Sequence, residues 1–242
     1  MNWKYSKHNI YSDHTITMNK DVPAEVYKNL FAMLKYRGIE TKQTLDMDKF
    51  HEDMMTREYT TIVGTRDVAR KIVGGDDAAD AAADGAATAT TTVNVLIIQF
   101  NEKSMKGLKT PDFKKVLTDT MKNLEGKCEI MTVTEEPINT HLQKAVRDFV
   151  DENRYIENHA YPQFIIEYPK HELMDKHEVV PQDELDTLMF QLKTQPNKLP
   201  KILVNDTAAI WIGARPGQVV RIYRSSETAG TAVAYRLVKR VS

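Results

Sequence analysis

The sequence is poor in three features that mark particular classes of protein. Its single cysteine, Cys128, cannot form an internal disulfide, which fits a reducing compartment and excludes a zinc site built from four cysteines. Residues 1–10 are polar and no run of about 18 apolar residues occurs, so we expect a soluble intracellular protein without secretory signal or membrane span. A net charge of −1 excludes binding to nucleic acid through bulk charge alone, so any such contact must be local or shared with partners.

The composition is otherwise that of an ordinary globular protein. Of the 242 residues, 41% are hydrophobic and 28% are charged. A chain of this length can form one large or two small domains and bury a core without disulfides or metals.

The first two thirds of the chain alternate between helix and strand patterns. Apolar residues at helical spacing predict helices over 22–37, 46–57, 110–124 and 139–153. In the third of these, Thr110 is expected to be the N-cap, with Pro111 at the first helical position. Strands are predicted over 59–63, 94–100 and 128–133, the second of them continuously apolar, as in a central strand covered on both faces. This alternation predicts an α/β sheet with covering helices.

One internal segment, 74–92, consists of Ala, Asp, Gly and Thr and contains no large apolar residue. Such a segment has little to bury, so we expect a disordered surface loop inserted in the first domain. Its four aspartates are interpreted as solvent-exposed residues without a specific role, with an acidic interaction tail as the alternative.

The chain changes character near Tyr161. The pattern predicts a short strand over 164–166, a helix over 182–193 and a β-hairpin formed by 217–224 and 231–238. The Ser/Glu/Thr/Gly cluster between the hairpin strands is a turn signal, because Gly230 can adopt a positive φ. We therefore predict an N-terminal α/β domain over 1–158 and a C-terminal α+β domain over 159–242.

The C-terminal domain carries a resemblance to a known family. The matching residues are Leu199-Pro200-Lys201-Ile202, Gly213, Gly217-Gln218-Val219-Val220-Arg221-Ile222, Arg224, Ser226-Glu227-Thr228-Ala229-Gly230 and Tyr235-Arg236-Leu237-Val238. This series resembles the fifth-largest subunit of eukaryotic nuclear DNA-directed RNA polymerases, which has a relative among the small subunits of the archaeal polymerase. Thr207, Ser225 and Ala232 depart from the pattern, which suggests a divergent version or one dedicated to a single polymerase.

The resemblance implies a fold and a function. The N-terminal domain is expected to be a jaw with a restriction-endonuclease-like sheet, and the C-terminal domain to be an assembly domain. The implied function is that of a noncatalytic polymerase subunit in the nucleus, without cofactor or metal. Its expected partners are the largest subunit, other polymerase subunits and downstream DNA near the jaw.

Basic residues dominate the end of the chain, with Asp206 and Glu227 as the only acids beside them. They are Lys198, Lys201, Arg215, Arg221, Arg224, Arg236, Lys239 and Arg240. A solvated face, a nucleic-acid surface and a dock for an acidic partner are the three possible interpretations. The resemblance favours docking on the largest subunit, and the matching residues implied for folding and docking are Arg224, Glu227, Thr228, Gly230, Tyr235 and Arg236.

The resemblance also implies a DNA-facing loop in the jaw, which we place at 135–140. Glu135 and Glu136 stand there in place of the family's Thr-Pro-Ser-Ala, and their carboxylates would repel phosphates. The candidates for contact with the DNA backbone are Asn139, Thr140, His141 and Lys144.

Three motifs suggest other chemistry. His171-Glu172 with His177 resembles a metalloprotease motif, but the second histidine is six residues away instead of four, so a structural role is favoured. Pro111-Asp112 followed by Glu125-Gly126-Lys127 matches a magnesium-dependent nuclease pattern. We expect Asp112 in a first helical turn, however, and Glu125 in a loop, where they cannot share a metal.

The third motif consists of Gly213 and Gly217, which bracket a turn before a strand. Two glycines so spaced could form a phosphate-binding loop, but such a loop precedes a helix. Because a strand follows here, a tight turn is favoured. A free-standing adaptor that uses the same hairpin for other partners is the remaining alternative to a polymerase subunit.

Overall fold

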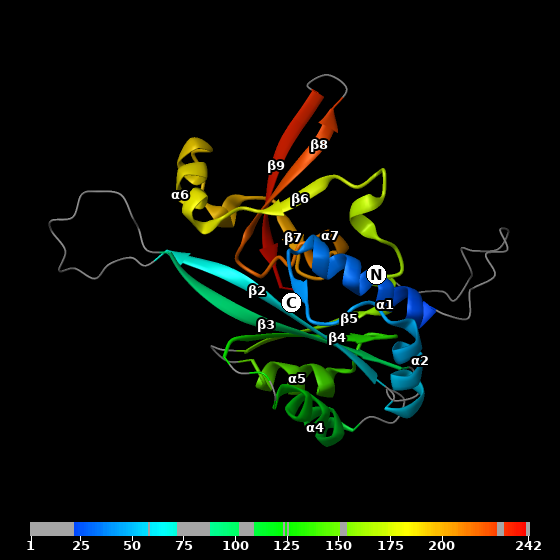
Figure 1. Cartoon of the computed structure of the whole chain (residues 1–242). Coiled ribbons are helices and arrows are strands. Elements are labelled where there is room, and N and C mark those ends of the chain that lie inside the picture. Colours follow the sequence, from blue (N-terminus) through cyan, green and yellow to red (C-terminus); the bar gives the residue numbers. More distant parts are fainter. Residues whose placement is uncertain are drawn as a thin grey trace, which may run out of the picture.

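The computed structural model describes residues 22–57, 59–71, 88–101, 109–122, 124, 126–150, 154–226 and 230–240. These residues form two β-sheets, each covered by helices (Figure 1). The strand order is β1-β2-β3-β4-β5 in the first sheet and β6-β8-β9-β7 in the second. The predicted mixed α/β fold is confirmed.

The first sheet is antiparallel on one side of β3 and parallel on the other. Its strands are β1 (Glu40–Thr41), β2 (Tyr59–Lys71), β3 (Thr88–Phe100), β4 (Cys128–Thr134) and β5 (Arg154–Ala160). β1, β2 and β3 pair antiparallel, whereas β3, β4 and β5 pair parallel. The predicted central strand is confirmed, because residues 95–98 of β3 are buried on both faces of the sheet.

Two pairs of helices cover this sheet. The α1 helix (Val22–Tyr36) and α2 helix (Met47–Thr56) pack on the face that carries Val95 and Ile97. The α4 helix (Thr110–Met121) and α5 helix (Thr140–Asp148) pack on the opposite face. The predicted cap of α4 is wrong, since its N-cap is Lys109 and no side chain bonds there. α5 is shorter than predicted and ends at Asp148.

The β2–β3 hairpin is much longer than the sequence pattern indicated. Its ladder runs from Tyr59↔Phe100 to Lys71↔Thr88, so the predicted strand over 59–63 is too short. The predicted loop over 74–92 is wrong from Thr88 onward, because residues 88–92 belong to β3. Four of these five residues are β-branched threonines, which suit a strand once a partner is present. The rest of that predicted loop lies outside the described residues.

The second sheet is antiparallel except where β7 joins it. Its strands are β6 (Lys176–Val179), β7 (Lys201–Leu203), β8 (Val219–Ser226) and β9 (Gly230–Lys239). The α6 helix (Gln182–Gln191) covers one face and the α7 helix (Thr207–Trp211) covers the other. The predicted hairpin is confirmed as β8 and β9, and Gly230 has a φ of +70°.

The strand predicted over 164–166 does not form. The segment between β5 and β6 consists of turns and two short 3-10 helices, η1 (Tyr161–Gln163) and η2 (Tyr168–Lys170); a third, η3 (Pro196–Lys198), precedes β7. The carbonyl oxygens of Phe164 and Ile165 accept hydrogen bonds from the Asn29 side chain, at 2.8 and 3.0 Å. The backbone here is therefore bonded to α1 instead of a neighbouring strand. β5 runs to Ala160, two residues past the boundary predicted at 158.

Gly64 on β2 allows β1 to pack closely against it. A Cβ atom at Gly64 would lie 2.7 Å from Ile39 Cγ2 and 3.0 Å from the Glu40 carbonyl oxygen. We predict that Gly64→Ala lowers the free energy of unfolding by about 1–3 kcal/mol, because backbone and a buried side chain must shift. Urea unfolding measures this, with Thr65→Ala as a neighbouring control. An unchanged urea midpoint for Gly64→Ala would contradict the close packing.

Lys193 ends α6 in a conformation that favours glycine. Its φ is +49°, its amide donates to the Phe190 carbonyl (3.1 Å), and the Thr194 amide donates to the Met189 carbonyl (3.2 Å). This is a Schellman motif with a side chain at the left-handed position. We predict that Lys193→Gly raises the free energy of unfolding by about 1 kcal/mol. Thermal unfolding measures it, with Lys198→Gly as a control that is not expected to stabilise. A lower melting temperature for Lys193→Gly would refute this prediction.

Candidate docking surface and domain junction

The outer half of the β8–β9 hairpin extends beyond the rest of its sheet (Figure 1). β6 pairs with β8 only as far as Tyr223, which lies opposite Lys176. β7 pairs with β9 only from Leu237 onward, which lies opposite Lys201. Within the described part of the chain, β8 after Tyr223 and β9 before Leu237 therefore pair only with each other. Both outer edges offer unpaired backbone groups to a partner.

Four of the six predicted docking residues lie on this hairpin. Arg224 is exposed on β8, with its Nε 3.5 Å from Asp175 Oδ2. Gly230 begins β9, while Tyr235 is half-buried against the apolar cluster of Leu188 and Leu237, on the side of the sheet covered by α6. Arg236 is partly exposed opposite Val220. Glu227 and Thr228 lie outside the described residues. Tyr235 thus contributes to the core, whereas Arg224 is the residue most available to a partner.

The basic end of the chain is less positive in three dimensions than along the sequence. Arg221 pairs with Glu178 (3.1 Å) and Glu184 (2.8 Å), and its guanidinium lies 5.9 Å from the centre of the Tyr235 ring. The Tyr223 hydroxyl donates a hydrogen bond to the Glu178 carboxylate (2.5 Å), and this bond is the largest cause of the lowered pKa of Glu178. Arg215 and Arg224 pair with Glu129 and Asp175. Asp206 and Glu227 are the only acids of the same sequence segment, but the partners of these arginines come from earlier elements.

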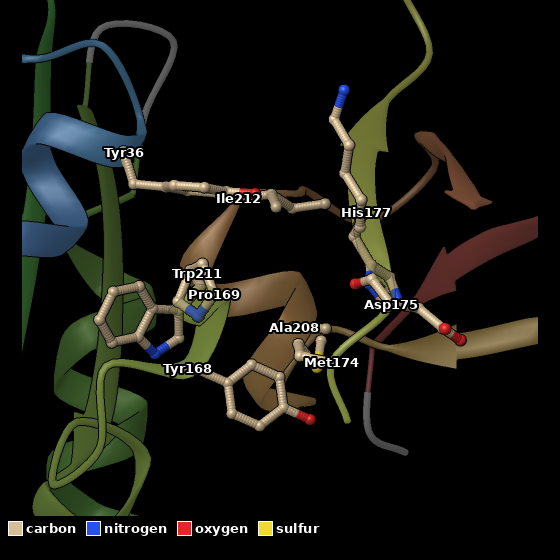
Figure 2. Close-up of a pocket in the computed structure, with 10 residues that line it drawn as sticks. Tyr36, Tyr168, Pro169, Met174, Asp175, His177, Ala208, Trp211 and Ile212 are labelled. Carbon is tan, nitrogen blue, oxygen red and sulfur yellow. The ribbon is translucent and has the colours of Figure 1, made fainter. Parts of the chain in front are cut away.

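A small cavity of about 90 Å³ lies where the second sheet meets α1 (Figure 2). Tyr36 of α1, Tyr168 of η2 and Trp211 of α7 line it, together with His177 of β6 and Asp175 just before that strand. His177 lies 2.7 Å from the Asp175 carbonyl oxygen through Nδ1. The Trp211 indole donates to the Gln163 carbonyl oxygen at 3.1 Å and is 1% exposed. The aromatic residues therefore serve to join the two sheets.

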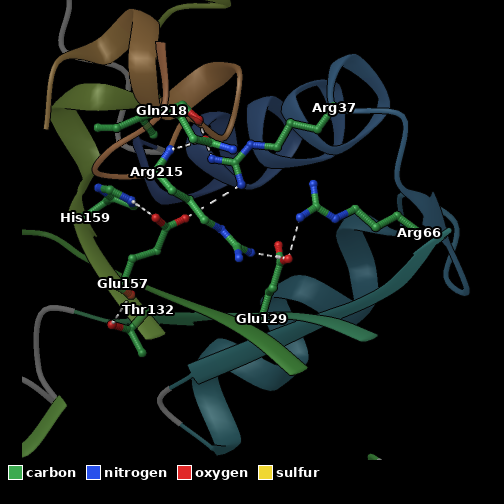
Figure 3. A network of polar contacts seen from close by, with 9 residues as sticks. Arg37, Arg66, Glu129, Thr132, Glu157, His159, Arg215 and Gln218 are labelled. Carbon is green, nitrogen blue, oxygen red and sulfur yellow. Dashed lines mark hydrogen bonds and ion pairs between the residues drawn. The ribbon is translucent and has the colours of Figure 1, made fainter. Parts of the chain in front are cut away.

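A buried ion-pair network forms the centre of this junction (Figure 3). Glu157 of β5 lies 3.7 Å from Arg37 Nη1 and 3.4 Å from His159 Nε2. The side chains of Arg37 and His159 are each 6% exposed. Arg37 also donates a hydrogen bond to the Ile210 carbonyl oxygen on α7. The end of α1, the edge strand β5 and α7 are thereby held together.

A second carboxylate of the network, Glu129 of β4, pairs with two arginines. Arg66 comes from β2, and Arg215 comes from the turn before β8. The Arg215 guanidinium also lies 4.4 Å from the centre of the Tyr155 ring. Glu129 therefore links the first sheet to the second, and the turn predicted around Gly213 and Gly217 carries one of the links. Both glycines have positive φ, as a turn requires.

Burial alone would raise the pKa of Glu157. The neighbouring His159 imidazole and the positive charges of Arg37 and Arg215 together outweigh burial, so the pKa of Glu157 falls to about 2. Sequence reasoning missed both glutamates. The signal available was Glu129 inside a largely apolar strand pattern, since a carboxylate there requires a charged partner when it is buried. The polar sequence around Glu157 gave no such signal.

The predicted DNA-contact residues lie together at the start of α5. Asn139 is the N-cap, with its Oδ1 accepting from the Leu142 amide at 2.9 Å. Thr140, His141 and Lys144 are exposed on the first turns of the helix. Asn139 therefore has a structural role, and the other three remain available to a ligand.

The described residues of the motifs that suggested metal chemistry do not form a metal site. Asp112 lies in the first turn of α4, as predicted, and Lys127 precedes β4, while Glu125 falls outside the described residues. His171 accepts a hydrogen bond from the Leu173 amide at 3.3 Å through Nδ1, in a local turn. Among the residues that the structure describes, no group of three or more His, Cys, Asp or Glu side chains is arranged to hold a metal ion. No helix among them is long and apolar enough to cross a membrane.

Fold and site together define a two-sheet α/β protein that presents an open-edged hairpin. Residues 166–238 match the family described as RNA polymerase Rpb5, C-terminal domain. The chain is 44% identical over 72 residues to the DNA-directed RNA polymerase subunit Rpo5 of Methanocaldococcus jannaschii, which covers 29% of this chain and 92% of the relative. The chain therefore belongs to the Rpb5 family of RNA polymerase subunits.

Two further relatives extend the comparison. The Rpo5 subunit of Methanococcoides burtonii is 44% identical over 68 residues, which covers 28% of this chain and 87% of the relative. The DNA-directed RNA polymerase RPB5 homolog of African swine fever virus is 30% identical over 135 residues, 53% of this chain. That match spans 65% of the viral relative's length. The family resemblance predicted from the sequence is confirmed.

The junction predicts a specific dependence of stability on pH. We expect Glu157→Gln to lower the free energy of unfolding by about 3 kcal/mol at neutral pH, because it leaves the buried Arg37 without its counter-charge. In the wild type the folded pKa of Glu157 is about 2, below its ordinary 4.5. Its contribution is therefore complete above pH 4.5 and is lost as the pH falls toward 2.

Urea unfolding at several pH values measures this effect. The difference between wild type and Glu157→Gln should shrink as the pH falls from 4.5 toward 2. Glu25→Gln, in an exposed pair with Lys28, is the control and should cost at most about 1 kcal/mol. Equal unfolding free energies for wild type and Glu157→Gln at pH 7 would contradict the account of the junction.

Proposed function

We propose that this chain is a noncatalytic subunit of a DNA-directed RNA polymerase. Its C-terminal domain docks on the largest subunit through the β8–β9 hairpin. Its N-terminal domain forms part of the jaw near downstream DNA. The observation that carries the proposal is that the family match over 166–238 includes the whole open-edged hairpin.

The hairpin is suited to docking because its inner half is anchored, and the two strands of its outer half pair only with each other among the described residues. Val220 and Ile222 are buried under α7, and Val219 and Leu237 under α6. A partner strand can add to an outer edge through backbone hydrogen bonds, with exposed side chains such as Arg224 fixing register and orientation. Docking of this kind requires no residue with catalytic chemistry.

The jaw role follows from the family and from the exposed start of α5. Thr140, His141 and Lys144 point a polar, partly basic surface outward. The exposed Glu135 and Glu136 precede them and weaken the attraction for phosphates. We therefore propose that DNA contact depends on the assembled polymerase to bring the DNA close. Location in the nucleus remains a prediction of the resemblance.

Affinity purification tests the proposal. The tagged chain, expressed in its own cells, should recover the largest polymerase subunit, identified by mass spectrometry. Arg224→Glu combined with Arg236→Glu should lower that recovery at least about tenfold, since reversed charge at a docking edge costs more than about 1.4 kcal/mol. Lys144→Glu, on the other domain, is the matched control and should recover the subunit normally.

The alternatives predict different results. If the wild-type chain recovers other proteins but no large polymerase subunit, it is a free-standing adaptor. If the purified chain cleaves DNA with magnesium and Asp112→Ala abolishes cleavage, it is a nuclease. Equal recovery by the wild type and the double variant would show that docking uses another surface.

A further inference from the structure

The ring of Phe190 on α6 is exposed, unlike the rings of the other phenylalanines. All seven phenylalanines lie in the described part of the chain, and the other six are buried or half-buried. Phe190 is 85% exposed, although it follows the buried residues Leu188 and Met189. A single exposed apolar residue is common on protein surfaces, so its surroundings decide whether it has a role.

A groove of about 480 Å³ lies beside this ring. Met189, Phe190, Lys193, Thr194, Gln195 and Lys198 line it. The two charged residues in this lining are both lysines, and neither pairs with a carboxylate of the described residues. The groove therefore combines an apolar wall with two lysines that form no ion pair with the described residues.

The backbone at Lys193 provides an independent observation. Glycine would occupy this left-handed position at lower cost, yet a lysine stands there at the edge of the groove. Residues kept in sparsely populated conformations cluster at functional sites. The conformation fixes the direction in which the chain leaves α6 and therefore where the lysine side chain begins.

We propose that this groove binds an acidic peptide segment of a partner protein. An apolar side chain of the segment packs on Phe190 and Met189, while its carboxylates pair with Lys193 and Lys198. Aromatic anchors surrounded by complementary charge are typical centres of protein interfaces. This surface lies on the side of the second sheet covered by α6, whereas α7 and the junction with the first sheet lie on the other side (Figure 1).

A nucleic acid is the less suitable ligand. Asp186 is exposed one helical turn before Phe190, and Asp183 is exposed a further turn back. A strand whose bases stacked on Phe190 would bring its phosphates toward these carboxylates. A peptide can place an apolar residue over the ring and confine its acidic residues to the lysine end.

Titration of the isotope-labelled full chain with short synthetic peptides tests the proposal independently of any polymerase. The probe has glutamates on one side of a phenylalanine only, and the matched control has lysines in their place. Amide shifts of Phe190, Lys193 and Thr194 in NMR spectra report binding. We expect the glutamate peptide to shift these amides, more weakly at high salt, and the lysine peptide to leave them unchanged.

Two variants separate binding from folding. Phe190→Ser and Lys193→Gly should each weaken binding of the glutamate peptide at least tenfold, although Lys193→Gly is expected to be the more stable protein. Arg224→Glu, on the hairpin, should bind like the wild type. The proposal is overturned if the glutamate peptide produces no shifts at these amides, if both variants bind it as the wild type does, or if a single-stranded oligonucleotide binds there and displaces it.

Discussion

Two largely buried glutamates on neighbouring strands, with side chains 16% and 19% exposed, determine how the halves of the protein are joined. Glu129 of β4 lies opposite Tyr155 of β5, two residues from Glu157, so both carboxylates project from one face of the sheet. They are balanced by Arg37 after α1, Arg66 on β2 and Arg215 before β8. Each charge would be costly without its partner, so the arrangement holds only when all three parts of the chain are in place.

This constraint links the packing to the proposed function. Trp211 and Phe164 belong to the same apolar cluster as the inward face of α1, so the first core continues across the junction to α7. α7 in turn covers the face of the second sheet that carries Val220 and Ile222. The base of the hairpin is thereby fixed relative to the first sheet, while its outer half is free of other strands. A subunit that docks at one end and positions a jaw at the other needs such a rigid connection.

Local patterns predicted the elements that depend on local physics. The helical spacing gave α1 and α2 nearly to the residue, the continuous apolar run gave β3 as the central strand, and the turn chemistry gave the hairpin with Gly230 at positive φ. The N-cap of α4 and the end of α5 were local errors of boundary, whereas the larger failures depend on distant partners. Residues 164–166 bond to Asn29 instead of forming a strand, and the extra length of β2 and β3 depends on their pairing with each other. The partners of Glu129 and Glu157 and the groove beside Phe190 could not be predicted from the sequence either, because they depend on residues brought together by the fold.

The central claim is that the junction makes the two sheets one cooperative unit. Native-state hydrogen exchange tests it most directly, by comparing the opening free energies of amides in β4 and β5 with those in β8 and β9. Our account predicts one common opening free energy for the slowest amides of both groups. It also predicts that Arg37→Met lowers this free energy by the same amount in both groups. Separate values, with β8 and β9 unaffected by that substitution, would contradict it.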